Sequence, residues 1–226
     1  MFYFVKYLFT LILFTGFLFT PAFAQEVKNP SLIVDQIEIS AEKFNVVLRD
    51  SQIVNLDDRH AVSWQVTIDN NLLYGNPYGN AVLRLYDQQH DDRFIEIGMG
   101  PKPDNKFWVA VTTEKEGYVI VHKDLERGWY PETKSIISYT DKAGLTVNNG
   151  ARIVVTNLDI GTFAIDSYST YGMESSTDPP AISSGSLVLD FLSGDPSKNI
   201  YAFFPFYVAA GIGIIVAILF LTKKRS

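Results

Sequence analysis

The feature that most restricts the fold of this chain is an alternation of apolar and polar residues through its middle. Residues 62–68 (Val-Ser-Trp-Gln-Val-Thr-Ile) show it most cleanly, with an apolar side chain at every second position. Successive side chains of a β-strand point to opposite faces, so this period of two predicts strands with one buried face. We expect further strands at residues 33–39, 81–86, 94–99, 107–112, 118–122, 153–156, 163–165 and 187–192.

Turn-forming residues separate these segments. Asn148-Asn149-Gly150 lies between two short apolar stretches, and Asn-Gly supplies the positive φ that the tight turn of a β-hairpin requires. Residues 173–186 are rich in Ser, Thr, Pro and Gly, and we expect a long loop there rather than a domain border. About twelve short strands at near-regular spacing predict an all-β fold, a single β-sandwich of the jelly-roll type.

The beginning of the chain has the composition of an export signal. Lys6 precedes a mostly apolar run at residues 8–19, and Ala22 and Ala24 then form a small-x-small peptidase site. These features predict a signal peptide at residues 1–24 that is cleaved from the mature protein. The alternative is a retained N-terminal anchor, because the whole segment is almost long enough to span a membrane.

The last apolar segment is long enough to cross a bilayer as a helix. Residues 200–221 contain no charged side chain, and 22 residues at ~1.5 Å each give about 33 Å of helix. Lys223, Lys224 and Arg225 follow, and cytoplasmic flanks of membrane spans collect such cations. We therefore expect a single-pass protein of the cell membrane, with its C-terminus in the cytoplasm.

The two ends together predict the organisation of the chain. We expect a signal peptide (1–24), an extracellular β-sandwich domain (25–192), a short stalk (193–199), a transmembrane helix (200–222) and a cytoplasmic basic tail (223–226). The alternatives for the last segment are a buried core helix and a sorting signal cut by a transpeptidase. Sortase substrates carry an LPxTG-like motif before the span, and residues 202–206 do not match it.

Small residues recur along one side of the expected transmembrane helix. Ala209, Gly213 and Ala217 are spaced by four, so on a helix they form a strip that lets another backbone approach closely. This pattern predicts self-association, or docking against another single span in a membrane complex. The alternative is composition alone, because Gly and Ala are common in transmembrane helices.

Composition excludes several kinds of site and partner. The chain has no cysteine, so no disulfide, thiolate metal site or cysteine nucleophile can form. Residues 25–199 hold all 25 acidic residues but 15 of the 19 basic ones, a net charge of about −10. This excess disfavours nucleic acid and anionic lipid surfaces as partners.

The late part of the expected sandwich resembles a known group of folds. Residues 151–155 (Ala-Arg-Ile-Val-Val) leading to residues 161–168 (Gly-Thr-Phe-Ala-Ile-Asp-Ser-Tyr) are similar to late strands of concanavalin-like and laminin-G-like sandwiches and of carbohydrate-binding modules. The resemblance covers about twenty residues. It implies a glycan-binding or adhesive role and a structural calcium near Asp166.

Two expected loops carry the residues that we consider for ligand binding. Flat rings stack on the C–H faces of sugars, and amides hydrogen-bond the hydroxyls, so rings paired with Asn on glycine-bent loops suit a glycan. The candidates are Tyr74, Asn76, Tyr78, Asn80, Trp129 and Tyr130. The alternative is that these rings pack inside the loops, with Asn and Gly present for the turns.

Acidic residues and histidines lie together in two places, 57–60 (Asp-Asp-Arg-His) and 90–93 (His-Asp-Asp-Arg). A metal site is one interpretation. Adjacent side chains point to opposite faces of a strand, however, so we expect turn residues in salt bridges instead.

Catalytic signatures are missing from the sequence. It contains no HExxH and no GxSxG, and Phe94-Ile95-Glu96-Ile97-Gly98 lacks the second acid of the ExDxxE pattern of laminarinase-type enzymes. We therefore expect a non-catalytic surface module that binds a glycan or an envelope protein. The alternatives are an accessory subunit of a membrane complex and a sandwich-fold glycoside hydrolase, for which carboxylates from distant strands would have to meet.

Overall fold

The computed structural model describes residues 33–61, 63–88, 90–113 and 116–194. The predicted signal peptide (1–24), transmembrane helix (200–222) and basic tail (223–226) lie outside these residues, as do the small-residue strip at Ala209, Gly213 and Ala217 and most of the stalk (193–199). Within the described ranges, no helix is both long enough and apolar enough to span a bilayer.

The described residues form β-strands and two short 3₁₀ helices, η2 (Ala41–Phe44) and η3 (Leu48–Asp50). The strands are β1 (Ile33–Ser40), β2 (Val54–His60), β3 (Ser63–Asn70), β4 (Leu73–Tyr74), β5 (Ala81–Asp87), β6 (His90–Met99), β7 (Phe107–Thr113), β8 (Gly117–Asp124), β9 (Ser135–Thr140), β10 (Gly144–Asn148), β11 (Ile153–Leu158), β12 (Ile165–Tyr171), β13 (Ile182–Ser184) and β14 (Ser186–Ser193).

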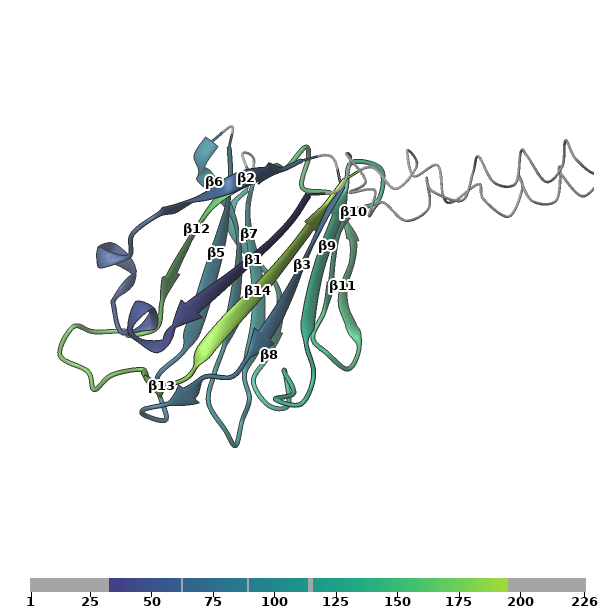
Figure 1. Cartoon of the computed structure of the whole chain (residues 1–226). Coiled ribbons are helices and arrows are strands. Elements are labelled where there is room, and N and C mark those ends of the chain that lie inside the picture. The colour runs from purple at the N-terminus through teal and green to yellow at the C-terminus, as the bar shows by residue number, and fades with distance from the viewer. Residues whose placement is uncertain (1–32, 62, 89, 114–115, 195–226) are drawn as a thin grey trace, which may run out of the picture. The chain divides into compact units, whose positions relative to one another are not determined.

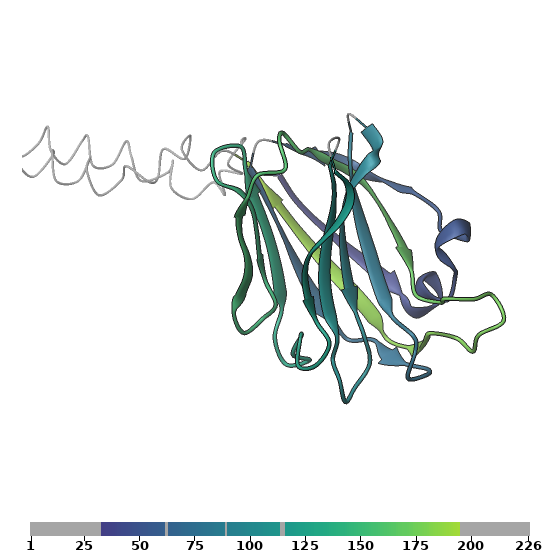
Figure 2. The same cartoon turned by 180° about the vertical axis from the view of Figure 1, so that it is seen from behind.

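These strands build a β-sandwich, which confirms the predicted all-β class. One six-stranded sheet has the order β1-β14-β3-β9-β10-β11, and the other has the order β2-β12-β5-β6-β7-β8. We call the second one the β5–β8 sheet. The pairings between neighbours are antiparallel, and the short strands β4 and β13 pair separately. The two large sheets pack face to face, as seen from opposite sides in Figures 1 and 2.

The core lies between the two sheets and follows the alternation of the sequence. In β3 every second side chain is buried, among them Trp64 and Val66. Leu83 of β5 and Ile97 of β6 enter the same core from the other sheet and are fully buried. Burial of such side chains contributes about 1.5–3 kcal/mol each, and this gain fixes which face of each strand turns inward.

The Asn-Gly hairpin is confirmed, and it also supports a neighbouring loop. Residues 149–152 join β10 to β11, and Gly150 has a φ of +96°. The Asn149 side chain is buried, its Oδ1 accepts hydrogen bonds from the backbone N–H groups of Ala151 (3.1 Å) and Arg152 (3.0 Å), and its Nδ2 donates to the carbonyl of Gly128 (2.7 Å). The hairpin therefore holds the loop that contains Gly128.

Four strands were not expected from the sequence, and the position of one expected strand was wrong. Two of the four are the short strands β4 and β13, which pair with each other, and β13 lies in the segment 173–186 that was expected to be a loop. β2 has mostly exposed side chains, so its residues 57–60 show no alternation, and they lie in a strand rather than the expected turn. β9 buries a serine at an inward position, which weakens its apolar pattern. Phe163 and Ala164 precede β12 instead of forming a strand, because the backbone N–H of Ala164 donates to Oδ1 of Asp87 (3.1 Å).

A buried ion pair joins the end of β5 to the first half of β6, and its arginine also contacts the loop before β12. Nη1 of Arg93 lies 2.8 Å from Oδ2 of Asp87, and these residues are 9% and 1% exposed. Nη2 of Arg93 donates to the carbonyl oxygens of Ile160 (2.7 Å) and Thr162 (3.1 Å). The pair therefore satisfies backbone acceptors of the loop as well as its own charges, as buried polar groups require.

Candidate functional site

Three loops meet at one end of the sandwich, the lower end in Figure 1. They follow β3 (residues 71–80, including β4), β6 (residues 100–106) and β8 (residues 125–134). Backbone hydrogen bonds join the second and third of these loops, since the N–H groups of Gly128 and Trp129 both donate to the carbonyl of Asn105, at 2.8 and 3.1 Å. Loops held this way on a rigid sheet are a common place for binding residues.

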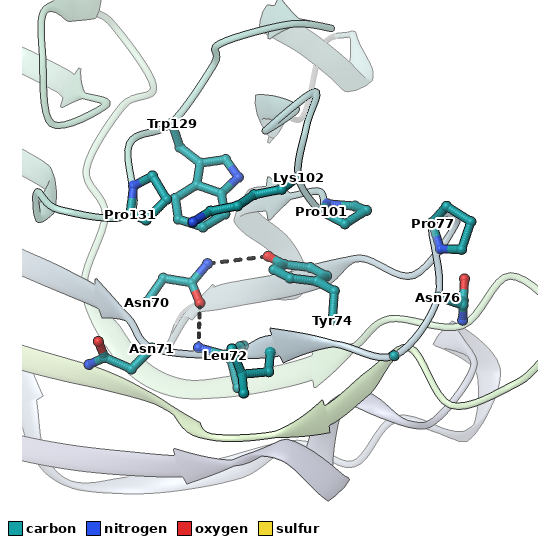
Figure 3. Close-up of a pocket in the computed structure, with 12 residues that line it drawn as sticks. Asn70, Asn71, Leu72, Tyr74, Asn76, Pro77, Pro101, Lys102, Trp129 and Pro131 are labelled. Carbon is teal, nitrogen blue, oxygen red and sulfur yellow. Dashed lines mark hydrogen bonds between the residues drawn. The ribbon is translucent and has the colours of Figure 1, made fainter.

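The first cleft at this end, which we call the Trp129 cleft, has a volume of about 620 Å³. Figure 3 shows Tyr74 and Trp129 in its interior and three prolines around it. The prolines are Pro77, Pro101 and Pro131, and Lys102 adds a charge. Three asparagines, Asn70, Asn71 and Asn76, also line the cleft, so its wall is mixed in polarity.

The rings of the Trp129 cleft belong largely to the protein core. Trp129 is 4% exposed, and its indole N–H donates to the carbonyl of Gly100 at 2.8 Å. The hydroxyl of Tyr74 donates to the carbonyl of Met99 (3.1 Å) and accepts from Nδ2 of Asn70 (3.2 Å). Burial raises the pKa of Tyr74, although the hydrogen bond from Asn70 partly offsets this effect. The two rings lie 6.3 Å apart and serve mainly as packing.

The amide of Asn76 is also committed within the protein. Its Nδ2 donates to the carbonyl oxygens of Pro179 (2.9 Å) and Pro180 (3.0 Å), and its Oδ1 accepts from the backbone N–H of Tyr78 (2.8 Å). The neighbouring Gly75 permits this close approach, because a Cβ there would lie 2.5 Å from the carbonyl oxygen of Pro180. Asn76 therefore fastens its loop to residues 179–180 rather than pointing free donors into a cleft.

A second cleft is lined by residues of the same loops and of β7 and β8. We call it the Trp108 cleft; its volume is about 320 Å³, and its lining includes Tyr78, Asn80, Trp108 and Ile120. Tyr78 is 77% exposed, and Ile120 is 48% exposed. Asn80 donates from Nδ2 to the carbonyl of Tyr78 at 3.2 Å, which helps to set the course of this loop. Here the rings face solvent.

Trp108 is held flat against the β5–β8 sheet. A Cβ at Gly98 would lie 1.9 Å from the indole ring, so the missing side chain of Gly98 makes room for the ring. Gly98 of β6 and Trp108 of β7 are direct partners in the sheet. The indole N–H donates to Oε1 of Glu96 at 3.1 Å. The ring is thus fixed in place before any ligand arrives.

Glu96 is the centre of a hydrogen-bond network on the outward-facing side of this sheet. Its carboxylate is 2% exposed and accepts from Arg84 Nε (2.8 Å), Tyr118 (2.7 Å), Tyr171 (2.8 Å) and Trp108 (3.1 Å). Burial alone would raise the pKa of Glu96, but these four donors outweigh it and the pKa is lowered. The carboxylate is therefore ionised at neutral pH and orients the surrounding rings.

Aromatic side chains continue from the Trp108 cleft across this network. Tyr118 of β8 is 48% exposed, and Phe94 of β6 lies 6.2 Å from it, centroid to centroid. The guanidinium carbon of Arg84 lies 4.1 Å from the centre of the Phe94 ring. These rings form a partly exposed surface. The ion pair between Arg84 and Glu96, which is largely buried, packs against them.

The six residues considered from the sequence fall into three groups. Tyr74, Asn76 and Trp129 lie together in the Trp129 cleft, and Tyr78 and Asn80 lie in the Trp108 cleft. Tyr130 is 39% exposed and is in the lining of neither cleft. The sequence shows that these loops carry rings, but the structure divides the rings between core and surface.

Sequence reasoning missed Trp108, Tyr118 and the lysines beside them. Trp108 and Tyr118 occupy outward positions of β7 and β8, next to inward residues such as Val109. Large rings at the polar positions of an alternating strand are the signal that could have identified them.

Asp166, the predicted calcium ligand, lies on β12, and its Oδ1 accepts from the hydroxyl of Ser167 at 2.8 Å. In the described part of the chain, no three His, Asp or Glu side chains converge so that they could hold a metal ion. His60, from the group of acidic residues and histidine at 57–60, belongs to no such cluster either. It is buried in β2, and its Nδ1 lies 2.9 Å from the hydroxyl of Ser193.

Comparison with known proteins gives matches by structure only. No protein-family model matches the sequence, and no curated protein matches it. Similar solved structures include the carbohydrate-binding module CBM66 from Bacillus subtilis (9% identity, TM-score 0.38, 62% of this chain and 78% of that chain). A prokaryotic β-1,3-1,4-glucanase (lichenase) derived from a mouse hindgut metagenome is also similar (14% identity, TM-score 0.41, 72% of this chain and 80% of that chain).

A third similar structure is a fructofuranosidase from Schwanniomyces occidentalis complexed with fructose (14% identity, TM-score 0.41). The match covers 74% of this chain and only 35% of the fructofuranosidase. The weak resemblance to carbohydrate-binding-module sandwiches that the late strands predicted is confirmed by these similarities.

Proposed function

We propose that the protein is a non-catalytic binding module, a sandwich of the jelly-roll type that binds a glycan in the Trp108 cleft and on the adjoining rings. One observation carries the proposal. Tyr78 and Tyr118 expose their rings to solvent beside Trp108, whose indole is fixed by Gly98 and Glu96. A ring that is already immobilised loses little conformational entropy when a ligand stacks on it.

The chemistry of sugars fits this surface. Pyranose rings present C–H groups on their faces and hydroxyls around their edges, so they suit a cleft with rings on its walls and polar groups at its margin. The Trp108 cleft supplies the rings of Tyr78 and Trp108, and Asn80 and the charged groups around it supply hydrogen-bonding partners. The Trp129 cleft is larger, but its rings are buried and already hydrogen-bonded.

Hydrolysis of the glycan is less well supported than binding. A glycoside hydrolase of the usual kind needs a carboxylic acid with a raised pKa that protonates the leaving group. The pKa of Glu96 is lowered, and so is that of Asp124 in the Trp108 cleft, where hydrogen bonds from Arg152 and His122 outweigh the effect of burial. Both residues are poor general acids at neutral pH.

Replacing Tyr78 with alanine tests this proposal. We expect binding to the glycan that the full-length protein prefers on a glycan array to weaken about tenfold or more, equivalent to ~1.4 kcal/mol. Because Tyr78 is 77% exposed, the melting temperature should barely change. Tyr130→Ala is the matched control, since Tyr130 is partly exposed on a nearby loop but lies in neither cleft. Equal binding by wild type and Tyr78→Ala, or loss of binding only in Tyr130→Ala, would contradict the proposal.

The second part of the proposal concerns where the module is displayed. We propose that residues 25–192 lie outside the cell, after removal of residues 1–24, and are anchored by residues 200–222. The charge-free apolar segment and the three cations after it support this topology. An envelope protein as ligand and association through Ala209, Gly213 and Ala217 stay predictions.

Truncation before residue 200 tests the anchor. We expect the full-length protein to stay with the membrane fraction after extraction at alkaline pH, and a chain ending at Asn199 to be released into the medium. Protease added to intact cells should degrade the full-length protein. A truncated chain that stays membrane-bound, or a full-length chain protected from the protease, would contradict the topology.

A further inference from the structure

The charges of the Trp108 cleft differ from those of the domain as a whole. Residues 25–199 carry a net charge of about −10, yet Lys106 and Lys123 both line this cleft. Its two acidic residues are Asp124 and Glu174. These four charges sum to zero, so the preference of the cleft for an anion depends on which of them are already paired within the protein.

Asp124 is already neutralised by groups on the protein. One of its oxygens, Oδ2, lies 3.1 Å from Nη2 of Arg152 and 2.9 Å from Nε2 of His122. These contacts lower the pKa of Asp124 although burial opposes them. Asp124 is therefore an ionised carboxylate whose charge is balanced by Arg152, and it does not balance either lysine.

Both lysines line the cleft together with the rings of Tyr78 and Trp108. Lys123 of β8 is the direct partner of Trp108 in β7. Lys106 immediately precedes β7, and its stem lies against Gly100, where a Cβ would be 3.0 Å from the Cβ of Lys106. Among the described residues, no ion pair is recorded for either lysine, whereas Lys134 pairs with Asp69 at 3.3 Å.

We propose that the ligand of the Trp108 cleft is a glycan that carries carboxylates, such as a chain of uronic acids. This inference rests on the proposed function. The sugar ring lies against Tyr78 and Trp108, and its carboxylate lies between the ammonium groups of Lys106 and Lys123. With Asp124 balanced by Arg152, the remaining charges in the lining are those of the two lysines and of Glu174. Their sum is a net charge of +1.

The acidic surface of the domain does not prevent this binding at physiological salt. Charges separated by more than ~8 Å are largely screened at that ionic strength, so the lysines nearest the ligand dominate its electrostatic energy. For the same reason, binding should weaken as salt is added. A neutral glycan that stacks on the same rings would show little dependence on salt.

The test compares three defined oligosaccharides of equal length: an oligouronate, a neutral oligosaccharide of the same linkage and a sulfated one. The full-length wild-type protein should bind the oligouronate at least tenfold more tightly than the neutral compound, and more tightly than the sulfated one. The double variant Lys106→Gln/Lys123→Gln should lose this preference and keep the weak binding of the neutral compound. Lys142→Gln, an exposed lysine outside both clefts, is the control and should behave like wild type.

Each outcome separates this inference from the proposed function. Equal binding of neutral and uronate compounds, or a preference that survives in the double variant, would overturn the inference and leave glycan binding intact. Equal binding of sulfated and carboxylated compounds would show charge attraction without carboxylate recognition and would also overturn it. Absence of binding to any glycan, or uronate binding unaffected by Tyr78→Ala, would overturn the proposed function itself.

Discussion

Replacing Trp129 with alanine is expected to destabilise the domain by ~3–5 kcal/mol, the usual cost of removing a large buried ring. Trp129 is 4% exposed, and its indole N–H donates to the carbonyl of Gly100. The variant loses this packing and leaves the carbonyl without its donor. Guanidinium denaturation of the purified protein measures the change in the free energy of unfolding.

The neighbouring residue provides the control for this experiment. Tyr130 follows Trp129 directly, is 39% exposed and is expected to cost less than about 1 kcal/mol when it is replaced with alanine. Trp129→Ala should weaken glycan binding only through loss of folded protein. If Trp129→Ala instead kept its stability and lost binding, the Trp129 cleft and not the Trp108 cleft would be the ligand site.

Replacing Arg93 with methionine is expected to cost ~3–5 kcal/mol, because it removes the cation that lies 2.8 Å from the buried carboxylate of Asp87. Arg93 contacts Asp87 at 2.8 Å and also donates to two carbonyl oxygens of the loop before β12. Methionine fills much of the same space without the charge, so the loss is mainly electrostatic. Chemical denaturation at neutral pH again measures the effect.

Two further variants show whether burial of the pair causes this cost. The double variant Arg93→Met/Asp87→Asn should be more stable than the sum of the two single changes predicts, because both members of the ion pair are removed together. Lys134→Ala breaks a half-exposed pair with Asp69 and should cost less than about 1 kcal/mol. If Arg93→Met and Lys134→Ala had similar small effects, the ion pair would not stabilise the fold.

Much of the local structure was predictable because it follows from short-range rules. The alternation in residues 62–68 predicted β3 to within two residues at its end, and the Asn-Gly pair predicted the hairpin between β10 and β11. β2 was missed because most of its side chains are exposed and it shows no alternation. β9 was missed because Ser135 takes an inward position where an apolar residue is expected.

The candidate site was only partly predictable, for a related reason. The sequence shows that Tyr74, Tyr78, Trp129 and Tyr130 lie in loops with turn residues, but not which rings are buried. That depends on hydrogen bonds between loops, such as the one from Trp129 to Gly100. Trp108, the central ring of the proposed site, was missed because it lies beside the other residues of the site only through the pairing of β7 with β6 and β8. The sequence around Trp108 does not show this pairing.

By itself, the sequence determined the strand pattern, the turns, the acidic charge and the absence of cysteine, because each depends on residues close together in the chain. The tertiary structure alone decided that β14 lies between β1 and β3, which are far from it in sequence. It also decided that four other strands each contribute one donor to Glu96. These donors are Arg84, Trp108, Tyr118 and Tyr171. Alternation assigns a side chain to one face of its strand, whereas the order of strands in the sheet determines which side chains meet on that face.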